Sequence, residues 1–291
     1  MKIQGIDFTS VPDGRKPITC AGCNLDAGTL LLEEFEVITS FEAFEELLRR
    51  PGPWVAGLDF PFGQPRKLID NLGWPKAWEA YVRYLAAKSK PEFVELLRVY
   101  REARPAGDKQ HLRRTDQAAK SRSPMMLFGV PVGKMFFEGA SRLLVSGASV
   151  LPCRPSDDPR VIVEAYPALV ARRWIGNRAY KNDEPRKQSP AQRSAREDII
   201  RGLGSEAKKH FGFDVQFDDE WAEASVEDGS GDRLDALLCA VQAGWAYSKR
   251  DRGFGIPSDC DPLEGWIVDP AIIAVKTAVD EFEIQRQQCQ Q

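Results

Sequence analysis

Carboxylates stand where predicted strands end or where a predicted helix begins. Asp7 follows an apolar run in the stretch GIDFTS, and Asp59 follows another in AGLDFP. Asp232 and Asp235 open the helical stretch DRLDA, and Glu164 ends the apolar run VIV. Clusters of carboxylate oxygens suit Mg²⁺ or Mn²⁺ better than zinc. The sequence therefore predicts a divalent-metal site to which four separate segments contribute acids.

Asp7 and Asp59 are expected to lie side by side. A helix crosses over between their strands, which makes the strands parallel and brings both acids to the carboxyl edge of the sheet. Adjacent like charges are costly unless a cation joins them. Asp232 and Asp235 are one helical turn apart and point the same way, and the small Ala236 allows that helix to approach the sheet closely.

Two of these acids also have a simpler explanation. Asp232 follows the turn GSG and is equally explained as a helix N-cap that complements the helix dipole. Glu164 is equally explained as a strand-end acid that pairs with a neighbouring arginine. Both alternatives stay open at the level of sequence.

Hydrophobic patterning predicts the elements that carry the first two acids. Apolar or alternating runs indicate strands at 3–8, 18–25 and 29–38, and the turn signal DAG between the last two indicates a hairpin. Residues 39–50 form an amphipathic helix that begins with a capping-box pattern. A buried strand follows at 54–58.

The rest of the chain is predicted to form helices and one further strand. Helices are predicted at 91–104, 135–145 and 232–248, and a strand at 161–164. A serine cap, a proline at the first helical position and Gly204 predict a further helix from 189 to 204. Residues 113–116 and 120–124 resemble a polar loop.

Positive charge is concentrated in two segments. Residues 66–122 contain 14 Lys and Arg against 7 Asp and Glu, and residues 172–209 contain 11 against 5, although the whole chain has a formal charge of only -3. We interpret residues 66–135 as a basic, mainly helical insertion between the fourth and fifth core strands. Its charges form either a solvated helical face or a surface that contacts phosphates. Its aromatic side chains either stack on bases or form the insertion's own small core: Trp74, Trp78, Tyr81, Tyr84 and Tyr100.

Composition indicates a globular protein of a reducing compartment. No apolar run is long enough for a membrane helix and no signal segment opens the chain, so a cytoplasmic location is expected. Six irregularly placed cysteines do not form a disulfide framework. Cys20 and Cys23 have a metal-ligand spacing but no second pair, and strand cysteines without a ligand role are the preferred interpretation. Two histidines far from any nucleophile motif disfavour serine or cysteine nucleophile chemistry.

In the order of these motifs the sequence resembles the DUF429 family of predicted RNase H-like nucleases. The stretches that carry the resemblance are GIDFTS, DFP, EAYP, D-x-x-DA and EGWI. The resemblance implies that residues 1–291 form a single α/β domain of the ribonuclease H-like fold. In that fold three antiparallel strands continue into parallel strands, and helices flank the sheet. The D-x-x-D helix is also similar to that of RuvC-type resolvases, whose acids bind Mg²⁺.

The resemblance implies two-metal hydrolysis of phosphodiester bonds. Asp7 would bridge the metal ions, Asp59 and Asp235 would complete the metal ligands, and Asp232 or Glu164 would be a further catalytic ligand or position the water. The implied substrate-binding residues are Thr9, Ser10, Arg113, Arg114 and Lys120. Mg²⁺ or Mn²⁺ is the expected cofactor and DNA or RNA the expected partner. No membrane association is expected, and no partner protein is identifiable.

Two other functions fit the same pattern. Actin-like ATPases and sugar kinases also begin with a strand that ends in Asp before hydroxyl residues, although Phe8 stands where their phosphate loops need glycine. The third possibility is a nucleic-acid-binding module that keeps the fold without turnover.

Overall fold

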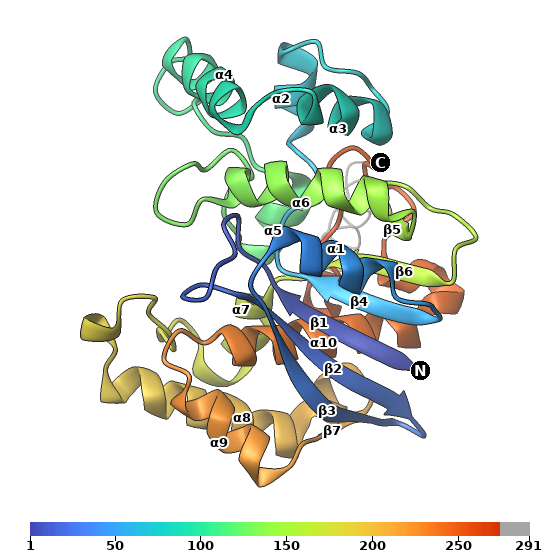
Figure 1. Cartoon of the computed structure of the whole chain (residues 1–291), viewed down its shortest axis with the longest axis vertical. Coiled ribbons are helices and arrows are strands. Elements are labelled where there is room, and N and C mark those ends of the chain that lie inside the picture. Colours follow the sequence, from blue (N-terminus) through green and yellow to red (C-terminus); the bar gives the residue numbers. More distant parts are fainter. Residues whose placement is uncertain (274–291) are drawn as a thin grey trace, which may run out of the picture.

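The computed structural model of the chain describes residues 1–273. In this part a mixed sheet of seven strands forms the centre, in the order β5-β6-β4-β1-β2-β3-β7 (Figure 1). Antiparallel pairs join β1 to β2 and β2 to β3, whereas β4, β6 and β5 continue in parallel from β1. The strands are β1 (Lys2–Asp7), β2 (Ile18–Asp26), β3 (Thr29–Ile38), β4 (Trp54–Leu58), β5 (Ser149–Leu151), β6 (Arg160–Glu164) and β7 (Asp214–Gln216).

The predicted hairpin and the predicted parallel pair are both confirmed. Ala27 and Gly28 connect β2 to β3 with φ angles of 45° and 81°, the left-handed backbone that a two-residue hairpin turn requires. Strand β4 pairs in parallel with β1, with Ile6 opposite Leu58. The carboxyl ends of β1 and β4 therefore meet at one edge of the sheet, as the strand patterning indicated.

Helices cover both faces of the sheet. Buried side chains of α1, α2, α3, α4 and α6 share one apolar cluster with the sheet, and those of α7, α8 and α10 share another. The helices are α1 (Phe41–Arg49), α2 (Arg66–Asn71), α3 (Trp78–Ala86), α4 (Lys90–Glu102), α5 (Arg114–Ala119), α6 (Val132–Ser146), α7 (Pro167–Ile175), α8 (Pro190–Phe211), α9 (Asp219–Glu227) and α10 (Asp232–Ser248). Two short 3₁₀ segments are η1 (Pro185–Lys187) and η2 (Arg250–Gly255).

Two predicted boundaries are wrong. Helix α8 does not end at Gly204 but continues to Phe211, because Gly204 keeps a helical backbone and the left-handed residue is Gly212, with a φ of 86°. Of the polar loop expected at 113–116 and 120–124, residues 114–116 lie in the helix α5. Asp116 accepts the backbone N–H of Arg113 and thereby caps this short helix.

The helices α2, α3 and α4 of the predicted insertion lie at one end of the molecule, beyond α6 (Figure 1). Most of its aromatic side chains are buried, and they belong to the same apolar cluster as one face of the sheet: Trp74, Trp78, Tyr81 and Tyr100. Only Tyr84 among the five named above is exposed. The four buried rings are therefore core residues as predicted, and the stacking interpretation is wrong for them. They do not form a separate core of the insertion, because they pack into the apolar cluster that the sheet also lines.

Cys20 and Cys23 face opposite sides of β2. Cys20 packs in the apolar cluster on one face of the sheet and Cys23 in the cluster on the other. Both thiols are free and buried. Side chains on opposite faces of a strand cannot share a metal ion, which agrees with the preferred interpretation of this pair.

No helix within residues 1–273 combines the length and the apolar character needed to cross a membrane.

Candidate metal centre

The backbone places Asp7 and Asp59 next to each other. Asp7 is the last residue of β1. The N–H of Asp59 donates to the carbonyl oxygen of Ile6 at 3.0 Å, which extends the parallel pairing of β4 with β1 by one residue. Both carboxylates therefore emerge at the same edge of the sheet.

Two glycines bring α10 onto these strands. A Cβ atom on Gly5 of β1 would lie 1.9 Å from the carbonyl oxygen of Ala236, and one on Gly57 of β4 would lie 2.5 Å from that of Cys239. Any side chain at either position would force the helix away from the sheet. Close contact between α10 and the sheet carries Asp235, in the first turn of α10, to the edge where Asp7 and Asp59 emerge.

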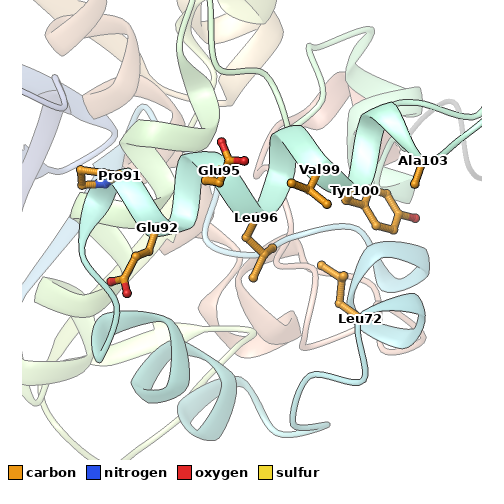
Figure 2. A pocket seen from close by; sticks show the side chains of 8 residues that line it. All are labelled: Leu72, Pro91, Glu92, Glu95, Leu96, Val99, Tyr100 and Ala103. Carbon is orange, nitrogen blue, oxygen red and sulfur yellow. The ribbon is translucent and has the colours of Figure 1, made fainter.

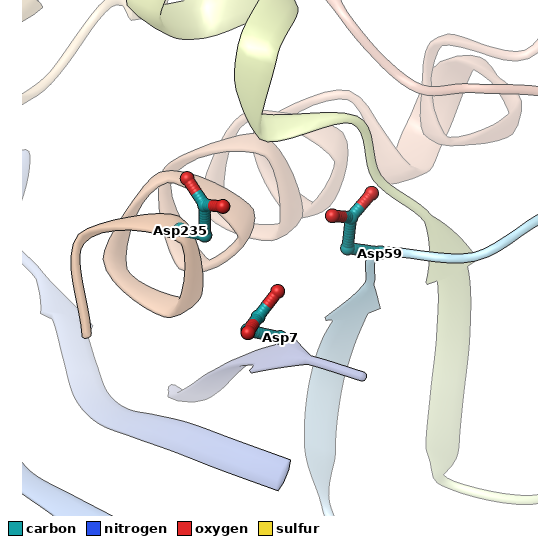
Figure 3. Close-up of side chains that lie close together, drawn as sticks. All are labelled: Asp7, Asp59 and Asp235. Atoms are coloured by element: carbon teal, nitrogen blue, oxygen red, sulfur yellow. The ribbon is translucent and has the colours of Figure 1, made fainter. Parts of the chain in front are cut away.

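Carboxylates of Asp7, Asp59 and Asp235 point into one space between β1, the end of β4 and α10 (Figure 3). Each residue offers an oxygen, and these oxygens lie within 4.8 Å of one another. Asp235 is fully buried, and the other two are half-buried. The three residues expected to hold the metal are the three that the fold brings together.

One ammonium group lies among these acids. The Nζ atom of Lys181 forms an ion pair with Oδ2 of Asp235, and the hydroxyl of Tyr180 donates to Oδ1 of the same carboxylate at 2.6 Å. Tyr180 and Lys181 come from the segment between α7 and η1. Both oxygens of Asp235 are thus engaged, and three carboxyl groups share the neighbourhood of one ammonium group.

Burial makes ionisation of the acids unfavourable. It raises the pKa of Asp7 well above its usual range; Lys181 opposes this rise, and Asp235 adds to it. Burial, with the repulsion of Asp235, raises the pKa of Asp59 to about 7. Because the pKa values of Asp7 and Asp59 are raised, a further positive charge is needed before all three carboxyl groups ionise together.

Asp232 lies beside this cluster and lines the same cleft. Burial and the nearby Asp228 raise the pKa of Asp232 to about 6. Its alternative role as N-cap is wrong, because the N-cap of α10 is Gly231 and the carboxylate of Asp228 accepts the N–H of Arg233 at 2.9 Å. Asp228 therefore caps the first turn of α10, and the Asp232 side chain faces the cleft.

Glu164 and Arg113 bind each other. Oε1 of Glu164 accepts from Nη2 of Arg113 at 2.6 Å, and Oε2 accepts from Nη1 at 2.8 Å and from the N–H of Phe62 at 2.9 Å. The remaining donors of Arg113 go to Asp116 and to the carbonyl oxygen of Glu264. All five guanidinium N–H groups are in use, and both side chains are almost completely buried.

That network bears on the roles expected for Glu164 and Arg113. Glu164 is not among the acids within 4.8 Å of one another, and the described geometry agrees with its alternative as a strand-end acid paired with an arginine. A phosphate would reach Arg113 only by breaking bonds to Asp116, Glu164 or Glu264. The two residues support one wall of the cleft, which both of them line.

The other residues expected to bind substrate separate into two groups. Thr9 and Ser10 line the cleft beside Asp7. Arg114 lies elsewhere, paired with Asp259 at 2.9 Å, and Lys120 is the left-handed C-cap of α5. Neither Arg114 nor Lys120 is among the described residues that line the cleft.

The cleft above the acids has a volume of about 320 Å³. The lining combines the carboxylates and Lys181 with apolar side chains, among them Phe60, Val132 and Met135. Lys16 and the exposed Arg122 add positive charge at its border. A ligand with a flat or apolar part would match the apolar lining, whereas an anionic group would need a bound cation before it could approach the carboxylates.

A larger open groove of about 750 Å³ lies on the insertion, away from these acids. Figure 2 shows its lining side chains along α4 and on α2. The lining is almost entirely apolar, and the carboxylate of Glu92 already accepts the N–H of Ser89 in the capping box of α4. Reactive groups converge in the cleft and not in this groove.

These acids fit a hard divalent cation. The donors are carboxylate oxygens alone, which Mg²⁺ and Mn²⁺ prefer. Asp7, Asp59 and Asp235 would hold the ion, and Lys181 shows that a positive charge is already accommodated there.

Sequence reasoning missed Tyr180, Lys181 and Asp228. The excess of positive charge in residues 172–209 was the available signal for Lys181, since that segment contains it. Nothing in the local sequence connects it to Asp235, and the contact depends on the fold.

Fold and site together define an α/β protein with a mixed sheet and a three-carboxylate centre at the sheet's edge. Residues 5–259 match the family described as protein of unknown function (DUF429). The chain belongs to the DUF429 family. No curated protein and no solved structure matches the chain.

Proposed function

We propose that this protein is a divalent-metal-dependent phosphodiesterase, a nuclease built on a ribonuclease H-like fold. The observation that carries the proposal is the convergence of Asp7, Asp59 and Asp235 within 4.8 Å at one edge of the sheet. A divalent ion held there would activate water and offset charge on a phosphoryl group. The mutual repulsion of three carboxylates this close is unfavourable, and a bound divalent ion would offset it more fully than Lys181 alone.

Strand order supports the fold assignment. The run β3-β2-β1-β4-β6 has three antiparallel strands followed by parallel ones, as a ribonuclease H-like sheet requires. The acids lie at the ends of β1 and β4 and on the helix that crosses them. This is the placement that the resemblance implies.

Within the cleft, the chain's own residues would bind and orient the substrate. Thr9 and Ser10 offer hydroxyl groups beside Asp7, and Arg122 offers a guanidinium at the border. Apolar lining residues such as Phe60 and Met135 suit a nucleobase or another flat group. Arg113 keeps Glu164 paired and so preserves the shape of the wall between them.

An ATP-dependent phosphotransferase is less well supported. The Phe8 ring packs against Phe44 and Phe60, with centroid distances of 5.3 and 4.6 Å, so a core side chain stands where the phosphate loops of that class need glycine. A binding module without turnover would use the same cleft, and the experiment below distinguishes it from the nuclease.

The test is cleavage of labelled single-stranded, duplex and branched DNA and of RNA with Mg²⁺ or Mn²⁺. We expect the wild type to cleave at least one substrate, and Asp7→Asn and Asp235→Asn to lose at least about 100-fold in rate, since each removes a charged ligand. Asp214→Asn, which removes the same charge on the distant strand β7, is the matched control and should cleave like the wild type.

Three results would contradict the proposal. Cleavage that persists in Asp7→Asn would show that the activity does not come from this centre. Metal-dependent ATP hydrolysis without cleavage would favour the phosphotransferase. Salt-sensitive binding of nucleic acid without any turnover would favour the binding module.

A further inference from the structure

Lys181 holds the position of a cation inside the acidic cluster. Its ammonium pairs with Oδ2 of Asp235, and its positive charge also acts on Asp7 and Asp59. Among the other described cations that line the cleft, Lys16 pairs with Asp183, and Arg113 pairs with Asp116 and Glu164. The exposed Arg122 lies with its Nη1 atom 4.0 Å from Sδ of Met126. Lys181 is therefore the cleft cation that the three-carboxylate centre itself engages.

The backbone around Lys181 is held from several sides. Nη1 of Arg196 donates to the carbonyl oxygen of Tyr180 at 2.7 Å, and Nε2 of Gln192 donates to that of Lys181 at 3.2 Å. The N–H of Asn182 donates to the carbonyl oxygen of Gly229 at 3.1 Å. Arg196 is almost fully buried, so this support is part of the core.

The side chain of Lys181, by contrast, can leave without moving that backbone. It is 36% exposed, whereas the Asp235 carboxylate that it contacts is fully buried. A lysine side chain has four rotatable bonds and a flexible stem. A change of rotamer would carry the ammonium from Asp235 into the open cleft.

We propose that Lys181 is a resident cation of the metal centre, which a divalent ion displaces when it binds. This inference rests on the proposed function, because it concerns the same three acids. The ammonium of Lys181 is paired with Oδ2 of Asp235, an oxygen that the metal ion would also use. The ammonium and a divalent ion bound to the same carboxylate would repel each other strongly in a poorly solvated site. Binding of the metal therefore includes the loss of the Lys181–Asp235 ion pair, which weakens the observed affinity for the metal.

Without metal, the same ammonium stabilises the folded protein. Asp7, Asp59 and Asp235 would otherwise face one another without any compensating charge. Lys181 thus has opposite effects on the two states: it stabilises the metal-free protein and competes with the metal. A lysine with a purely structural role would not weaken metal binding.

The first test is a calorimetric titration of the full chain with Mn²⁺ at pH 8. We expect Lys181→Met, which keeps an unbranched stem without the charge, to bind Mn²⁺ at least about tenfold more tightly, which corresponds to ~1.4 kcal/mol. Its melting temperature in EDTA should be lower than that of the wild type. Lys16→Met is the matched control, because it removes the same charge from the same cleft without a contact to the three acids, and its affinity should be unchanged.

A second measurement uses the wild type alone and stays informative if Lys181→Met does not fold. Amine-reactive labelling followed by mass spectrometry reports how accessible each lysine is. Saturating Mn²⁺ should raise the labelling rate of Lys181 several-fold and leave that of Lys16 unchanged.

The possible failures are distinguishable. Equal or weaker Mn²⁺ binding by Lys181→Met, or a labelling rate at Lys181 that stays the same or falls, would overturn the displacement while leaving the metal centre intact. An absence of Mn²⁺ binding by the wild type and by both variants would overturn this inference together with the proposed function.

Discussion

Gly5 and Ala236 are in such close contact that a Cβ atom on Gly5 would lie 1.9 Å from the Ala236 carbonyl oxygen. The same atom would lie 2.1 Å from the backbone nitrogen of Ala240. Both neighbours are helix backbone, which cannot move as a flexible side chain can. This contact sets the distance between α10 and β1, and with it the distance between Asp235 and Asp7.

Gly5→Ala is therefore expected to damage both stability and the metal centre. Moving α10 away should lower the free energy of unfolding by about 1–3 kcal/mol or more and weaken Mn²⁺ binding. Urea denaturation and metal titration measure the two effects. Gly14→Ala is the control, since nothing lies within 4 Å of its Cβ position. A Gly5→Ala protein with wild-type stability and affinity would show that the helix is not held by this contact.

Asp7→Asn should stabilise the protein when no metal is present. Burial and the charge of Asp235 raise the pKa of Asp7, so its ionised form is unfavourable at pH 8. Removing that charge is expected to raise the free energy of unfolding in EDTA by ~1–2 kcal/mol. The gain should shrink at about pH 4.5, where Asp7 is protonated in the folded protein. Lower stability than the wild type at pH 8 would contradict this account of the cluster.

Asp59 gives a pH dependence of defined sign. Burial and Asp235 raise its pKa from 3.8 to about 7 in the folded state. Between these values the folded protein binds more protons than the unfolded chain, so its stability falls as the pH rises. The contribution of Asp59 to the free energy of unfolding is fully present below the pKa of the unfolded chain and is lost as the pH rises through about 7. One group changes stability by at most ~1.4 kcal/mol per pH unit.

The measurement is the free energy of unfolding in EDTA for the wild type and Asp59→Asn, at steps from about pH 4 to about pH 8. Relative to the variant, the wild type should lose stability across this window. Asp214→Asn, at a half-exposed acid on β7 that pairs with Lys208, should follow the wild type. Parallel curves for the wild type and Asp59→Asn would show that Asp59 titrates normally.

The pair of Arg113 and Glu164 should be important for stability. Replacing Arg113 by Met would leave the buried carboxylates of Glu164 and Asp116 without a positive partner. Loss of one member of a buried ion pair typically costs 3–5 kcal/mol. We expect Arg113→Met to fall in this range in chemical denaturation.

The neighbouring Arg114 provides a matched control. It is about half exposed and pairs with Asp259, so Arg114→Met should change stability by less than ~1 kcal/mol. Equal effects of the two substitutions would argue against a structural role for Arg113. It would then be available to bind a phosphate, as the sequence suggested.

Local sequence was sufficient to predict the three metal-ligand candidates. Asp7 and Asp59 each follow an apolar run, and the register of two parallel strands joined through a helix brings their ends together. Asp235 follows from helical spacing, because it lies one turn after Asp232 at the start of the helix. The leucine periodicity did not predict that α10 is buried on all sides from Leu234 to Ala246, with Asp235 included. The relations that place the three acids depend on spacing within a few residues or on a general rule of strand connection, so they can be read without the fold.

Only the tertiary structure decided which partners these acids have. Lys181 and Asp235 are 54 residues apart, and Arg113 and Glu164 are 51 apart, with no periodic pattern to connect either pair. From the sequence, Glu164 could be either a further ligand or a strand-end acid paired with an arginine. In the fold, α5 begins beside Glu164 and supplies Arg113. Local propensity determines where a side chain emerges, whereas its charge environment comes from segments that meet only when the chain is folded.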